Sequence, residues 1–125
     1  MANGTIAFDT LSTSGQISGT AKSVDSDYLA YGSAKVWNKT LADGTGIEDS
    51  FNIASLTDTA SGRQAHNFST NMASANYAPQ ITATTSNPDA EWLDTISSSS
   101  CGGRMWDGSA YVDKKQSVTV HGDVA

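Results

Sequence analysis

The chain has little of several residue types that define large classes of protein. Among its 125 residues there is one cysteine, Cys101, which excludes an internal disulfide framework and a multi-cysteine metal site, and indicates synthesis in a reducing cytoplasm. Lysine and arginine number 7 against 13 acidic residues, so no basic patch for phosphate contacts is expected and nucleic acid is not a predicted partner. No run approaches the roughly 20 apolar residues that span a bilayer, so no membrane segment is predicted.

Large aliphatic side chains are also scarce, which limits the core of the single domain expected at this length. Disorder is nevertheless not expected, because charged residues are only 16% of the chain and there are three Trp and four Tyr residues. Ser and Thr number 32, and Asp outnumbers Glu by 11 to 2, which favours strands and turns over helices. The composition therefore predicts an all-β domain with a small core, completed by association between chains.

Short apolar runs separated by Gly, Asn, Asp or Ser recur along the chain, as is typical of sandwiches and barrels. Within them, we expect a bulge near Ser55, a turn at Gly62, and one helical turn over residues 71–76, while residues 97–103 are expected to form a flexible loop. Strands are expected over 5–11, 15–21, 33–39, 47–56, 64–70, 80–85, 91–97, 104–112 and 116–122.

The first part of the chain differs from the rest. Residues 1–32 contain no Trp, and their apolar residues are isolated among Gly and Ser. We therefore expect an extended N-terminal arm over 1–32, ordered by a partner, followed by a β-sandwich domain over 33–125. The expected architecture is an antiparallel, jelly-roll-like sandwich.

Several separated sequence blocks lie within residues 32–123. They are Ala34-Lys35 with Trp37, S-F-N-I-A-S-L-T-D over 50–58, Gly62, Asn67-Phe68, A-S-A-N-Y-A over 73–78 and S-V-T-V-H-G-D over 117–123. In this order they resemble a β-sandwich domain common in tailed-phage virion proteins, which occurs at tail-fibre tips and in short virion surface proteins. The loop after Trp37 lacks the aromatic residue often found there in the family.

The resemblance implies a homotrimer on a virion that is made in the bacterial cytoplasm. One hypothesis is a head-decoration (cement) or short head-fibre protein, whose arm docks on the major capsid protein or another virion protein. The alternative is a tail-fibre tip that recognises a host surface glycan or protein, and a polysaccharide hydrolase is a third. A chain of 125 residues leaves no room for a fibre shaft, which favours the first hypothesis.

Aromatic residues are the candidates for surface recognition, because flat rings bind the apolar faces of sugars. Trp92, Trp106 and Tyr111 are the residues singled out, and Tyr77 is a further candidate. We expect Trp37 in the core, since few aliphatic residues are present to fill it.

No catalytic, metal or cofactor residues are predicted, and the chain is not expected to be an enzyme. The family has no known catalytic residues to transfer, and no G-x-S-x-G motif is present. His66 is expected to be a structural histidine, on the same strand face as Phe68. His66 and His121 are far apart in sequence, so a zinc site within one chain is not expected. The alternative is a zinc ion bound by histidines from three chains around a symmetry axis. Glu91 and Asp94 are expected on opposite faces of a strand, which argues against a glycosidase pair.

Overall fold

The computed structural model describes residues 16–18, 23–25, 28, 31–83 and 90–125. Within these ranges no helix is both long and apolar enough to cross a membrane. The strands in the described residues are β1 (Gln16–Ser18), β2 (Ser23–Asp25), β3 (Ala34–Thr40), β4 (Ile47–Phe51), β5 (Ile53–Ala60), β6 (Arg63–Phe68), β7 (Ala78–Ala83), β8 (Ala90–Ser97), β9 (Ser100–Trp106) and β10 (Gln116–His121).

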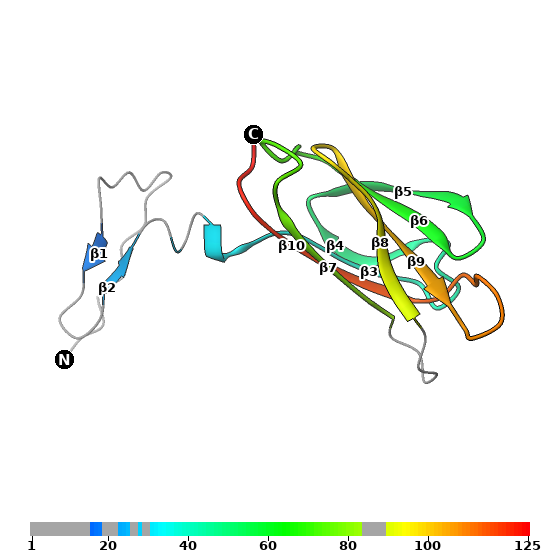
Figure 1. Cartoon of the computed structure of the whole chain (residues 1–125). Helices are drawn as coiled ribbons and strands as arrows, with labels where there is room; N and C mark the ends of the chain where they lie inside the picture. Colours follow the sequence, from blue (N-terminus) through cyan, green and yellow to red (C-terminus); the bar gives the residue numbers. More distant parts are fainter. Residues whose placement is uncertain (1–15, 19–22, 26–27, 29–30, 84–89) are drawn as a thin grey trace.

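Two antiparallel four-stranded sheets form a β-sandwich, which confirms the expected fold class (Figure 1). The first sheet has the order β4-β3-β10-β7, and the second has the order β5-β6-β9-β8. The pairs β3–β4, β5–β6 and β8–β9 are hairpins within one sheet. A jelly roll winds its eight strands as two Greek keys, and these three hairpins depart from the jelly-roll-like order expected from the sequence.

The apolar part of the core lies between β3 and β10 of the first sheet and β6 and β9 of the second. Alternation along these strands turns every second side chain inward, as the burial of β6 and β10 shows. The buried apolar cluster consists of Val36, Phe68, Met72, Cys101, Val118 and Val120, with Ile53, Tyr77 and Ile81 packed against it.

The other part of the core is polar and is centred on His66. Asn38 Nδ2 lies 2.9 Å from His66 Nδ1, and His66 Nε2 lies 3.2 Å from Gln116 Oε1. Thr40 Oγ1 accepts a hydrogen bond from the Gln116 backbone N–H, and Gln64 donates its side-chain amide to the Gly44 carbonyl. All five side chains from these two sheets are buried. His66 is therefore the structural histidine that the sequence predicts.

Asn52 separates two strands that the sequence predicts as one strand over 47–56. Its φ angle is 59°, in the left-handed region that Asn tolerates better than most residues. The Asn52 side chain donates to the carbonyls of Lys35 and Thr70 and accepts from the Thr70 N–H. The chain therefore leaves the first sheet at Phe51 and enters the second at Ile53. The bulge expected near Ser55 is present as a register shift between Ile53 and Ser55.

Two further expectations are wrong. Residues 71–76 form bends rather than a helical turn, and Met72 is held by an isolated bridge to Val124. The expected flexible loop over 97–103 is a tight turn at Ser98 and Ser99 followed by β9. The Tyr77 hydroxyl contacts the carbonyls of Ser97 and Ser100 at 2.9 and 2.8 Å, which ties the chain before β7 to this turn.

The described part of residues 1–32 includes a separate two-stranded sheet formed by β1 and β2. β1 lies within the strand expected over 15–21, whereas β2 was not expected. The strand expected over 5–11 lies outside the described residues. Near the sandwich, His121 Nδ1 lies 3.2 Å from the Gly32 carbonyl oxygen.

Candidate functional site

The outer face of the first sheet carries the most distinctive set of exposed side chains. Trp37 and Lys39 point outward from β3, because the alternate residues Val36 and Asn38 point into the core. In the register of the sheet, Trp37 pairs with Phe51 of β4, and Lys39 pairs with Asp49. This arrangement corrects the expected core position of Trp37, whose side chain is 38% exposed.

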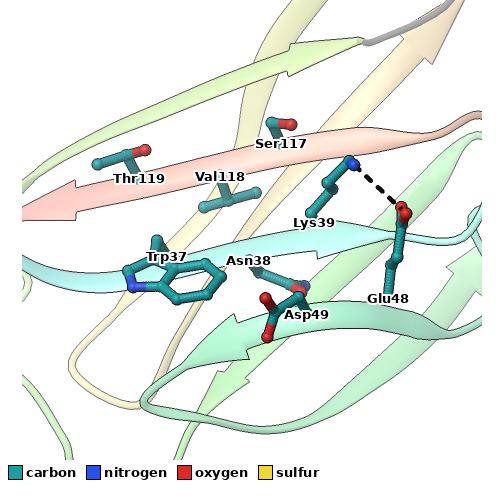
Figure 2. Close-up of a pocket in the computed structure, with 8 residues that line it drawn as sticks. All are labelled: Trp37, Asn38, Lys39, Glu48, Asp49, Ser117, Val118 and Thr119. Carbon is teal, nitrogen blue, oxygen red and sulfur yellow. Dashed lines mark hydrogen bonds and ion pairs between the residues drawn. The ribbon is translucent and has the colours of Figure 1, made fainter.

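A groove of about 490 Å³ runs over β3 on this face. Figure 2 shows Trp37 and Lys39 on β3, between Glu48 and Asp49 of β4 on one side and Ser117 and Thr119 of β10 on the other. The backbone at Asn38 and Val118 runs beneath the groove, since both side chains are buried. One aromatic ring, two carboxylates, one ammonium group and two hydroxyls therefore line the groove, which is wide enough for a small ligand.

A β-bulge brings Glu48 to the groove beside Asp49. The register runs from Lys39 opposite Asp49 to Thr40 opposite Ile47, so Glu48 is the extra residue on β4. Bulges redirect side chains in this way. Without the bulge, strict alternation would turn Glu48 away from Asp49.

Two lysines share one carboxylate at one end of the groove. Lys39 Nζ lies 3.3 Å from Glu48 Oε1, and Glu48 Oε2 also forms an ion pair with Lys115. The hydrogen bond from Lys115, followed by that from Lys39, lowers the pKa of the Glu48 carboxyl. Asp49 is placed differently, because its side chain bonds to the neighbouring backbone: Oδ1 accepts the Ser50 N–H at 2.9 Å. Asp49 therefore keeps acceptor positions that face solvent.

A second, more apolar cavity of about 300 Å³ adjoins the Phe51 side of this face. It is lined by Lys35, Phe51, Asn52, Thr70 and Val124. The Phe51 side chain is 54% exposed. The two neighbouring aromatic residues, Trp37 and Phe51, therefore give this face an apolar strip beside the polar groove.

The aromatic residues singled out from the sequence lie elsewhere. Trp106 and Tyr111 are brought together at the end of β9, with ring centroids 5.0 Å apart in an edge-to-face arrangement. The Arg63 guanidinium lies 5.7 Å from the centre of the Tyr111 ring. Both aromatic side chains are half-buried in this cluster. Trp92 lies in β8 opposite Arg104, and its side chain is outside the described residues.

The carboxylates considered for glycoside hydrolysis lie on β8 of the second sheet. Asp94 sits at a register shift between Leu93 and Thr95 and accepts a hydrogen bond from Arg104 Nε at 2.6 Å. That bond lowers the pKa of the Asp94 carboxyl. The Glu91 side chain is outside the described residues. In the part of the chain that the structure describes, no group of three or more His, Cys, Asp or Glu residues could hold a metal ion.

Comparisons with known proteins identify no relative from which a function of the groove could be inferred. The chain matches no family model, no curated protein and no solved structure.

Proposed function

We propose that the chain is a structural protein of a tailed-phage virion, acting as a homotrimeric head-decoration or short head-fibre protein on the capsid surface. Residues 1–32 attach it to the major capsid protein or another virion protein. The observation that carries the proposal is an open edge of the sandwich, where core-facing apolar side chains remain exposed. We call this edge, formed by β7 and β8, the β7/β8 seam.

The side chains at the seam are oriented as core residues. Leu93 pairs with the buried Gly103, and Ile96 pairs with the buried Cys101, so both belong to the inward face of the second sheet. They are nevertheless 42% and 40% exposed. Across the seam, Ile81 of β7 pairs with the buried Val118 and is only half-buried. Within the residues that the structure describes, the sandwich therefore does not close over its own core at this edge.

Association of copies would cover this surface. Full burial of a Leu or Ile side chain contributes about 1.5–3 kcal/mol, so covering the exposed part of Leu93 and Ile96 contributes about 1 kcal/mol for each. β7 and β8 are also the last strands of their sheets, and an uncovered edge strand is a site for pairing with another chain. A trimer in which each copy covers the seam of the next would bury six of these side chains and protect the edges.

The sequence blocks that resemble the phage domain coincide with residues that define this sandwich. Asn52 of the S-F-N block makes the corner between the sheets. Tyr77 of the A-S-A-N-Y-A block bonds to the turn between β8 and β9, and Gly62 turns β5 into β6 with a φ angle of 69°. These block residues therefore have structural roles in the sandwich, which supports a fold in common with the phage domain rather than an active site in common.

The N-terminal segment suits attachment to a larger surface. β1 and β2 are three residues long, and a two-stranded hairpin is at best marginally stable alone in water. A capsid partner would supply the surface against which such a hairpin becomes stable.

Electron microscopy of purified virions, with gold-labelled antibody against this chain, tests its place. We expect label distributed over the capsid. Label confined to the tail tip would contradict the decoration function and favour the alternative, a tail-fibre tip that binds a host surface. The exposed Trp37 and Phe51 are the feature that favours this second function.

A further inference from the structure

We infer that the groove between Trp37 and Lys39 is a binding site for a neutral pyranose sugar. The site lies over β4, β3 and β10 on the outer face of the first sheet, whereas the seam exposes inward-facing side chains of β7 and β8, so the inference does not depend on the proposed trimer. It also differs from the aromatic cluster of Trp106 and Tyr111, which belongs to the second sheet.

The aromatic side of the groove is provided by Trp37. A Trp side chain that is 38% exposed leaves a large apolar surface in water. It stands on a strand in the middle of a sheet, between β4 and β10, so its backbone is held on both sides. A pyranose presents apolar C–H groups on the faces of its ring, and the Trp37 indole ring at the wall of the groove offers a flat apolar surface for such a face.

The polar side of the groove matches sugar hydroxyls. Asp49 offers carboxylate acceptor positions, and Ser117 and Thr119 offer hydroxyls that donate and accept. Thr119 pairs with Trp37, and Ser117 pairs with Lys39, so the two hydroxyls follow the length of the groove. Vicinal hydroxyl groups on one sugar edge could therefore bond to Asp49 while the opposite edge meets β10.

The position of Asp49 disfavours an acidic sugar over Trp37. Lys39 and Lys115 share the single carboxylate of Glu48 at one end of the groove, so the two lysines, Glu48 and Asp49 together carry no net charge. Asp49 is the carboxylate of this set that lies outside the ion pairs. A carboxylated sugar would meet this charge in a partly desolvated groove, and like-charge contacts disfavour binding. A neutral pyranose meets no such penalty.

The probes are the methyl glycosides of glucose, galactose, mannose and N-acetylglucosamine, with N-acetylneuraminic acid as the anionic comparison. Saturation-transfer NMR and Trp fluorescence on the full chain measure binding. We expect at least one neutral glycoside to bind with a Kd on the order of 1 mM and the acidic sugar to bind at least about tenfold more weakly. Failure of all four neutral glycosides, or preference for the acidic sugar, would overturn the inference.

Variants locate the site. Trp37→Ala and, separately, Asp49→Ala should each weaken binding at least about tenfold. Gln80→Ala is the matched control, because Gln80 is exposed on the same face and pairs with Thr119 from the far side of β10. It should leave the affinity unchanged. Should Trp37→Ala fail to fold, Asp49→Ala decides alone, because Asp49 is exposed and its side chain bonds only locally.

The same variants separate a sugar site from a protein interface. If this face instead joins copies of the chain, Trp37→Ala will lower the sedimenting mass and leave any glycoside affinity unchanged. That pair of results would contradict the inference. Reduced affinity with an unchanged mass would support it.

Discussion

Asn38 of the first sheet and His66 of the second are joined by a buried hydrogen bond of 2.9 Å across the interior of the sandwich. The Asn38 amide donates to Nδ1, so Nε2 carries the proton and donates to Gln116. This neutral tautomer satisfies both ring nitrogens. Protonation of Nδ1 would place a donor against the Asn38 amide donor, in a buried site.

The His66 pair predicts a pH dependence of stability. Burial lowers the pKa of His66 below its ordinary value, and the Gln116 bond opposes this only in part. In the unfolded chain His66 therefore takes up a proton near pH 6.5, whereas in the folded chain it stays neutral to lower pH. Stability is full above that pH and falls below it, by up to about 1.4 kcal/mol per pH unit. Urea unfolding between pH 7.5 and 5 measures this slope.

His66→Gln should remove most of the slope, whereas His121→Gln should retain it, because His121 is only half-buried at the end of β10. The carboxyls with lowered pKa values, such as those of Glu48 and Asp94, titrate below this pH range and do not contribute to the measured slope. Equal stability at pH 7.5 and 5 would contradict the burial of a neutral His66.

Asn52 predicts a difference between two small substitutions. Asn52→Ala loses the side-chain bonds to Lys35 and Thr70 and also forces a Cβ-bearing residue without local bonds to remain at a φ angle of 59°. We expect it to destabilise the protein by about 2–4 kcal/mol. Asn52→Gly loses the same bonds but accepts this φ angle freely, so it should cost about 1 kcal/mol less. Urea unfolding of both variants would contradict the account if Gly were as costly as Ala.

Cys101 should be inert in the folded protein. Burial raises the pKa of its thiol to about 12, and the side chain has no exposure to solvent. Because the thiolate is the reactive form, reaction with a chromogenic disulfide reagent at pH 8 should be at least about 100-fold slower in the native protein than in guanidinium chloride. Equal rates would show that the strand β9 opens readily.

The sandwich strands were largely predictable from alternation, because β3, β6 and β10 each turn every second residue into the core. The corner at Asn52 was not, since a single left-handed residue leaves the alternation of the flanking sequence intact. The strand expected over 104–112 overlaps β9 only at its end, because β9 runs from Ser100 to Trp106. The earlier part of β9 was missed because Ser100, Gly102 and Gly103 carry no apolar pattern. Glycine is required at position 102, because the Gln64 carbonyl oxygen lies only 2.9 Å from where a Cβ would be.

The groove was only partly accessible to sequence reasoning. Lys35 and Lys39 share the strand face of Trp37, and two lysines on one face indicate solvent, so the exposure of Trp37 could have been predicted from the sequence. The position of Glu48 in the groove could not, because it depends on a bulge in the pairing of β4 with β3. The wall formed by Ser117 and Thr119 depends on β10 joining β3 from the other end of the domain.

The β7/β8 seam gives the most direct test of the proposed assembly, by sedimentation velocity at low micromolar concentration. The account predicts a trimer of about 39 kDa, three times the 13.0 kDa of the chain. Leu93→Asn should shift it towards the monomer, whereas Thr95→Asn, on the outer face of the same strand opposite Gly102, should not. A folded 13.0 kDa monomer for the unaltered chain, or a trimer indifferent to Leu93→Asn, would contradict assembly through this seam.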